Sequence, residues 1–198
     1  MKKYKLTRRG AIMKIVLIIL IIIIVVGVIL VSRNIYFVES AFNKTPAGKI
    51  EIKTIPESSV LVSEVEGNYY NTRNLLFRRL FNYIQDNKVA MTVPVEAAID
   101  RSSMKFYLGS KDRKKDLPDG MNVRVETVPG RTVLSIGIRG AYSKDNFDKA
   151  LARLESWLNE NKEYVRRGDA YGVFWDAPFM PWFLKRSEVH IPIITREE

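Results

Sequence analysis

The side chains that usually carry catalytic or metal chemistry are few in this chain of 198 residues. Cysteine is absent, which excludes disulfides, thiolate metal sites and cysteine nucleophiles. His190 is the only histidine, and no serine lies in a nucleophile motif, so a serine–histidine–acid hydrolase is not indicated. Two glutamates remain, Glu96 after a strand-like segment and Glu188 after an aromatic loop. These residues favour a binding protein, with a small-molecule hydrolase that uses Glu96 or Glu188 as the weaker alternative.

The strand predicted at about 187–194 decides how His190 is interpreted. Alternation places Glu188, His190 and Pro192 on one face and Val189, Ile191 and Ile193 on the other. Because the apolar triplet is predicted to be the buried face, His190 is predicted to point outward. This orientation disfavours His190 as an axial iron ligand, although a ligand role stays open. Tyrosine oxygens are the alternative ligands: Tyr69, Tyr83, Tyr142 and Tyr171.

A short loop at 174–183 is unusually rich in large apolar side chains. Pro178 and Pro181 interrupt it and prevent a regular helix or strand. Such a loop must bury its apolar surface somewhere, and three roles are open. It caps the core, forms one wall of a ligand groove, or contacts a protein or a lipid surface. Its large residues are Phe174, Trp175, Phe179, Met180, Trp182 and Phe183.

The helix predicted after residue 71 offers a second wall for a groove. Arg73, Leu76, Arg79 and Tyr83 recur at helical spacing, and such a stripe suits a flat ligand with carboxylates. A solvated basic face is the alternative for this stripe. The opposite, inner face of this helix is predicted to hold Phe77, Leu80, Phe81 and Ile84. The candidate groove residues are Arg73, Leu76, Arg79, Tyr83, Phe174, Trp175, Phe179, Trp182, Phe183 and Lys185.

The elements that would position these residues occur twice. The segment Ile50–Pro56 matches Val123–Pro129 at an offset of 73, and Gly67 matches Gly140 at the same offset. The pattern in each copy predicts two strands, an amphipathic helix and two further strands. The repeats cover about 50–110 and 122–194. The sequence therefore predicts an α+β fold in which a duplicated ββαββ unit forms a twisted, barrel-like antiparallel sheet flanked by two helices.

An N-terminal segment stands apart from the repeats. Residues 15–31 are all Ile, Leu or Val except Gly27, and with residues 11–14 they are long enough for a transmembrane helix. The segment 1–31 carries six basic residues and no acid, so of the net charge of +10 only 10 − 6 = +4 falls on the rest. That distribution argues against nucleic-acid binding. It predicts a single-pass cell-membrane protein, with a cytoplasmic N-terminus and an extracytoplasmic domain.

The predicted organisation has four parts. Residues 1–10 form a cytoplasmic basic tail, 11–31 a transmembrane helix in contact with membrane lipid, and 32–49 a linker. Residues 50–196 form the domain that contains both repeats.

Three stretches of this domain resemble the SOUL (haem-binding protein) family. One is Glu51–Lys53, followed by Gly67 and the helix Leu76–Ile84. The others are Ala90–Glu96, with its Met-Thr-x-Pro-Val pattern, and Tyr171–Val189, a Pro-rich aromatic segment leading to a basic pair and Glu-Val. The resemblance covers about residues 50–194.

The resemblance implies a GyrI-like duplicated α+β fold. It also implies that haem or another tetrapyrrole binds non-covalently in a surface groove, for storage, transfer or sensing. The sequence departs from the family pattern at Asp86, where the helix usually ends with Gly, and at Lys185–Glu188, where Arg-Arg-Asn-Glu is commoner. A domain that binds proteins or lipids through the aromatic loop 174–183 is the alternative function.

Overall fold

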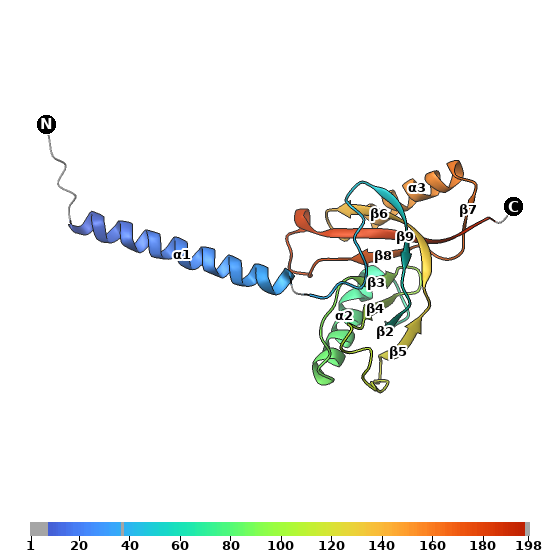
Figure 1. Cartoon of the computed structure of the whole chain (residues 1–198), viewed down its shortest axis with the longest axis horizontal. Coiled ribbons are helices and arrows are strands. Elements are labelled where there is room, and N and C mark those ends of the chain that lie inside the picture. The colour runs from blue at the N-terminus through green and yellow to red at the C-terminus, as the bar shows by residue number, and fades with distance from the viewer. Residues whose placement is uncertain (1–7, 37, 197–198) are drawn as a thin grey trace. The chain divides into compact units, whose positions relative to one another are not determined.

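The chain divides into two compact units, Met1–Val38 and Glu39–Glu198. The computed structural model describes residues 8–36 and 38–196, with side chains for 11–27 and 38–196 (Figure 1). Most of the basic tail predicted at 1–10 lies outside the described residues.

The first unit contains one helix, α1 (Arg8–Tyr36). None of the helices in the described part of the chain is long and apolar enough to cross a membrane. The predicted transmembrane helix at 11–31 is therefore not supported, and this finding contradicts the predicted single-pass membrane location. The side chains of residues 28–31 lie outside the described part of the chain.

The second unit is an α+β domain. Its strands form one antiparallel sheet with the order β1-β6-β9-β8-β3-β4-β2-β5, and β7 pairs with β9. Its elements are β1 (Ile50–Ile55), β2 (Ser58–Glu64), α2 (Tyr69–Asp86), β3 (Val95–Ala98), β4 (Ser103–Tyr107), β5 (Arg124–Val128), β6 (Arg131–Arg139), α3 (Lys144–Glu160), β7 (Tyr164–Arg166), β8 (Tyr171–Phe174), the 3₁₀ turn η1 (Trp182–Leu184) and β9 (Arg186–Thr195).

The predicted duplication is visible in the strand order. The copies are β1-β2-α2-β3-β4 and β5-β6-α3-β8-β9, with β7 added to the second. The first strand of each copy pairs with the second strand of the other, β1 with β6 and β5 with β2, while β3 pairs with β8 at the centre. Each copy therefore needs the other to complete its sheet. The result is a curled half-barrel, which confirms the α+β class and the antiparallel, barrel-like sheet.

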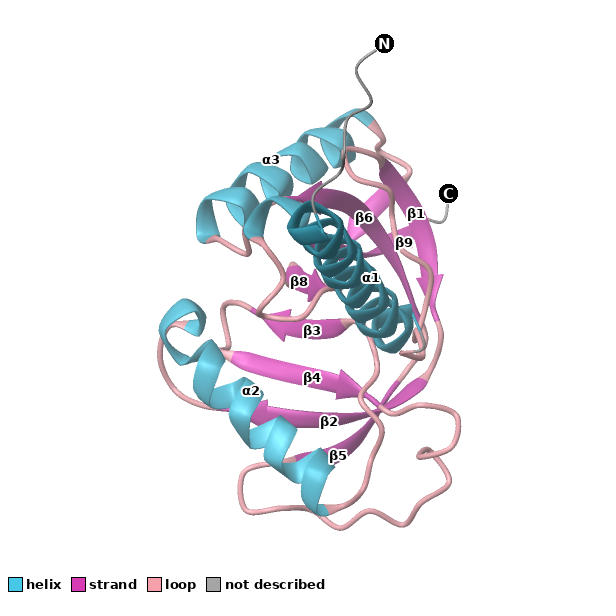
Figure 2. Cartoon of the chain, turned by 90° about the vertical axis from the view of Figure 1, so that its left-hand side faces the viewer, coloured by secondary structure: helices cyan, strands magenta, loops and turns pink. Residues whose placement is uncertain are grey.

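Both long helices of this unit pack on one face of the sheet, which we call the helix face (Figure 2). The β3–β8–β9 register puts the core residues under α2 on the same face as those under α3. Asn68 caps α2 by accepting from the Tyr70 amide, and Ser143 caps α3 in the same way from Asn146. Apolar residues of β6 and β9 fill the space below α3: Leu134, Ile136, Val189, Ile191 and Ile193.

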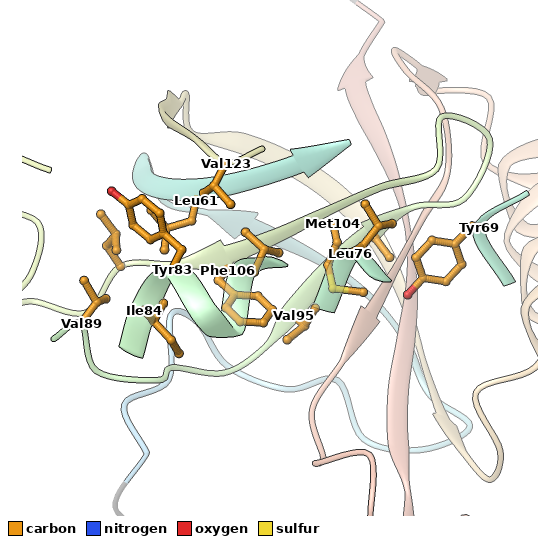
Figure 3. Packing of buried hydrophobic residues seen from close by; sticks show 13 residues of the cluster. Leu61, Tyr69, Leu76, Tyr83, Ile84, Val89, Val95, Met104, Phe106 and Val123 are labelled. Atoms are coloured by element: carbon orange, nitrogen blue, oxygen red, sulfur yellow. The ribbon is translucent and has the colours of Figure 1, made fainter. Parts of the chain in front are cut away.

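The face of α2 that meets the sheet differs from the prediction. Leu76 and Tyr83, which were assigned to the groove stripe, are buried in the core with Leu80 and Ile84 (Figure 3). Phe81, predicted to be internal, is 41% exposed. The buried side of α2 is therefore rotated from the predicted one, and it includes Tyr69 in the first turn.

The opposite face of the sheet is buried too, and this corrects the prediction for His190. His190 is fully buried and Glu188 is 1% exposed, although they lie on the face opposite the Val–Ile triplet. Residues 39–49, predicted as linker, cover this face. The ring of Phe42 lies 5.9 Å from that of His190 and 5.5 Å from that of Trp175. Alternation identified the two faces correctly but did not show that the chain before the domain covers the second one.

Candidate functional site

A groove of about 290 Å³ lies on the helix face. It lies over the central strands of the sheet, beside the first turns of α2. The aromatic loop and the turn before α3 complete its walls. The residues that line it are Tyr69, Arg73, Phe77, Val95, Met104, Ala141, Tyr142, Phe174, Asp176, Pro178, Trp182 and Lys185.

Two cationic side chains, Arg73 and Lys185, line this mainly apolar groove. The Nη1 atom of Arg73 donates to the carbonyl of Tyr142 at 2.8 Å. Lys185 donates to the carbonyl of Pro178 at 2.9 Å, and its Nζ lies 5.0 Å from the Tyr142 ring centre. Within residues 8–36 and 38–196 neither cation forms an ion pair with a carboxylate. The carboxylate of Asp176 is bound by Arg186, so the groove keeps an excess of positive charge.

Tyr142 connects the aromatic loop to the first residue of β9. Its hydroxyl accepts from the Asp176 amide at 2.9 Å and lies 2.9 Å from the Arg186 carbonyl, to which it donates. Its ring centre is 4.6 Å from that of Phe174. These contacts hold Phe174 at the floor of the groove. Burial raises the pKa of Tyr142, so this hydroxyl stays a neutral donor and acceptor.

Tyr69 is the polar group at the floor of the groove. Its side chain is 3% exposed, and its ring stacks at 6.3 Å on Phe174. In the part of the chain that the structure describes, no group forms a hydrogen bond with its hydroxyl. The buried side-chain atoms that lack a partner there are Ser63 Oγ and Arg131 Nη1. The Tyr69 hydroxyl is not among them, so its small exposed area opens into the groove that it lines.

The predicted groove residues divide into three groups. Arg73, Phe174, Trp182 and Lys185 line the groove together. Phe179 and Phe183 are on the exposed side of the loop, 81% and 54% exposed. The remaining four lie elsewhere: Leu76 and Tyr83 in the core, Arg79 against the carbonyl of Glu64, and Trp175 on the opposite face of the sheet.

Several lining residues were not identified as groove residues from the sequence. Val95 and Met104 come from central strands, and Ala141 from the turn before α3. Phe77 was assigned to the core, and Asp176 and Pro178 were seen only as parts of the loop. Tyr69 and Tyr142 were named as possible iron ligands, and their matching places after Gly67 and Gly140 were the available signal.

The opposite face of the sheet carries a polar cluster around Glu188. The carboxylate accepts from Lys53 Nζ at 2.5 Å, His190 Nε2 at 2.7 Å and Trp175 Nε1 at 2.7 Å. Burial alone would raise the pKa of Glu188, but the bond from His190 and the charge of Lys53 lower it to about 2. Burial lowers the pKa of His190, so the imidazole is neutral and its Nδ1 accepts from the Tyr171 hydroxyl at 3.2 Å.

The carboxylate of Glu96 is also buried and bonded to cations and a hydroxyl. It is 4% exposed and forms ion pairs with Arg131 and with Lys105, the second at 3.1 Å. The Tyr107 hydroxyl donates to it at 2.7 Å. Burial would raise the pKa of Glu96, but the charges of Arg131 and Lys105 lower it. Over the described residues no group of three His, Asp or Glu side chains is placed to hold a metal ion.

Comparison with solved structures identifies the class of fold. The domain is similar to the EcmrR C-terminal domain, with a TM-score of 0.60 and 13% identity, covering 75% of this chain and 98% of that one. The EcmrR–DNA complex in EcmrR-RPo gives a TM-score of 0.61 and 14% identity, and the match covers 75% of this chain and 58% of that one. A hydrolase from Listeria innocua gives a TM-score of 0.52 and 15% identity, and the match covers 76% of this chain and 94% of that one. These likenesses show a shared fold.

The family follows from a closer sequence match. Residues 37–192 match the model of the SOUL heme-binding protein family. The match covers most of the chain, so the protein belongs to this family. No curated protein matches the sequence.

Haem is the group that this family implies, and the lining residues fit it. A haem site needs an apolar slot for the ring and cations for two propionates. Phe77, Phe174 and Trp182 supply aromatic walls, while Arg73 and Lys185 supply two cations that form no ion pair within the described residues. Ligand pockets usually measure about 300–1,000 Å³. The groove of about 290 Å³ lies just below this range, so it would enclose only part of such a ring.

Proposed function

We propose that this protein binds haem or a related tetrapyrrole non-covalently in the groove, for storage, transfer or sensing. One observation carries the proposal: an aromatic slot is lined by two cations for which the described residues supply no carboxylate partner. Each cation is partly exposed and bonds to a backbone carbonyl, and an anionic ligand would add a charge-assisted hydrogen bond at each. A flat ring with two carboxylates matches both the slot and the charges. Family membership supports the same ligand class.

The proposal is for a binding protein and not for an enzyme. The two glutamates considered for hydrolysis each have several cationic or hydrogen-bonding partners, and both are almost fully buried. Their lowered pKa values keep them ionised at neutral pH. A carboxylate held in this way is a poor proton donor, which supports a structural role for Glu96 and Glu188.

The test is a titration of the full chain with ferric haem, followed by the Soret absorption. The variant Arg73→Gln/Lys185→Gln should weaken binding about tenfold, since each partly exposed charge contributes up to about 1 kcal/mol. Arg78→Gln/Lys162→Gln is the matched control, because both residues are exposed and neither lines the groove. Absence of saturable binding by the wild type, or equal weakening by both variants, would contradict the proposal.

A second candidate function rests on the outer side of the loop. Phe179, Trp182 and Phe183 are 81%, 67% and 54% exposed, an unusual concentration of aromatic surface. Such a surface suits contact with a protein or with lipid headgroups. Phosphatidylserine vesicles should co-sediment more wild-type chain than Phe179→Ser/Phe183→Ser, a variant that leaves the groove lining intact. Equal co-sedimentation would count against the lipid form of this function.

A further inference from the structure

The Tyr69 hydroxyl is unusual among the polar groups of the groove. Buried hydroxyls normally bond to a partner within the protein. Across the described residues, no group forms a hydrogen bond with the Tyr69 hydroxyl. Tyr69 lies at one end of the core cluster under α2 (Figure 3) and lines the groove. Because its hydroxyl is not among the fully buried atoms, a ligand in the groove can reach it.

Other residues that could bind iron are less suitable. His190 is fully buried on the opposite face of the sheet and bonds to Glu188 and Tyr171. In the groove itself, the Tyr142 hydroxyl is occupied by the backbone of the loop. Met104 is a thioether, which is a soft ligand and a weak match for ferric iron. Tyr69 is the lining residue with a hard oxygen that is free to coordinate.

A cation beside Tyr69 supports an anionic oxygen at this position. Arg73 follows Tyr69 by four residues on α2, which places the two side chains on the same side of the helix. The positive charge of Arg73 stabilises a phenolate, in opposition to burial, which raises the pKa of this phenol. Without a ligand, burial prevails and the hydroxyl remains protonated.

Building on the proposed function, we propose that Tyr69 is the axial ligand of a ferric porphyrin in the groove. The phenol O–H bond breaks, an oxygen–iron(III) bond forms, and the proton leaves to solvent, with no change in oxidation state. Tyrosine is an established axial ligand class for ferric haem. The proposal makes the site selective for an iron-bearing ring over a metal-free one of the same shape and charge.

The test compares ferric haem with metal-free protoporphyrin IX on three full-length proteins: the wild type, Tyr69→Phe and Tyr70→Phe. Tyr69→Phe should weaken ferric haem about tenfold or more and change metal-free porphyrin less than about twofold. Tyr70→Phe is the neighbouring control, because it removes a hydroxyl from the same turn of α2 outside the groove lining. Resonance Raman spectra of the haem-loaded wild type should show iron–phenolate modes that Tyr69→Phe lacks.

Three results would overturn the inference. Unchanged haem affinity in Tyr69→Phe, or equal loss for both porphyrins, would show that Tyr69 only packs against the ring. A spectrum of the haem-loaded wild type without iron–phenolate modes would overturn the inference without the need for any variant. In each of these cases the wild type still binds a porphyrin, and the proposed function survives. If the wild type binds neither porphyrin, the proposed function fails as well.

Discussion

The substitution Glu188→Gln tests the most densely bonded charge in the domain. Glu188 belongs to β9 and is 1% exposed, and its side chain points toward the segment 39–49, where it accepts from the Thr45 amide. Glutamine keeps the size of the side chain but removes the charge that pairs with Lys53. The groups around its two oxygens are Lys53 Nζ, His190 Nε2, Trp175 Nε1, the Thr45 amide and the Ser135 hydroxyl.

The size of the effect follows from the lowered pKa of Glu188. Each pKa unit corresponds to about 1.4 kcal/mol, so the fall from 4.5 to about 2 represents about 3 kcal/mol of folding free energy. Because the folded pKa is below the unfolded one, this contribution is complete above about pH 4.5. It is lost as the pH falls toward 2, where the folded protein also takes up the proton.

Urea unfolding followed by far-ultraviolet circular dichroism measures this contribution. Trp175 fluorescence is unsuitable because its indole bonds to Glu188. At pH 7 we expect Glu188→Gln to lose about 3 kcal/mol relative to the wild type, and at about pH 3 clearly less. The exposed Glu57→Gln should change little at either pH. A loss under about 1 kcal/mol at pH 7, or the same loss at both pH values, would refute the reasoning.

Two further predictions concern packing. A Cβ on Gly137 would lie 2.3 Å from the Pro46 carbonyl oxygen, so Gly137→Ala should lower stability by about 1–3 kcal/mol in urea unfolding. Gly168→Ala, whose Cβ would have an ordinary contact distance, is its control, and equal effects would count against a clash. Leu154→Ala should cost about 2–5 kcal/mol because Leu154 is fully buried on the side of α3 that faces the sheet. The exposed Leu184→Ala should change the midpoint little, and a similar loss in both would contradict the core assignment.

Much of the fold was predictable because it depends on local pattern. Alternating residues in Ile50–Ile55 and Arg124–Val128, and the helical spacing in α3, are properties of short segments. The offset of 73 between the copies predicted the duplication. It did not predict that the first strands pair across the copies, because strand pairing depends on partners far apart in the sequence.

The groove was only partly predictable for the same reason. Arg73 and the loop residues Phe174, Trp182 and Lys185 stood out by charge and aromatic content. Residues such as Met104 have ordinary side chains, and their place in the groove follows from which strands are central in the sheet. The exposure of Phe179 depends on how the loop turns at its prolines, which composition does not specify.

The sequence by itself determined the sparse catalytic chemistry, the repeated unit and the aromatic loop, because residue type and spacing are local. Only the tertiary structure decided which surfaces are covered. His190 and Glu188 belong to a polar face that residues 39–49 bury. The Tyr69 hydroxyl has no hydrogen-bond partner among the described residues, and Tyr69 lines the groove between α2 and the loop. Burial is a relation between distant segments, and no periodicity within one segment specifies it.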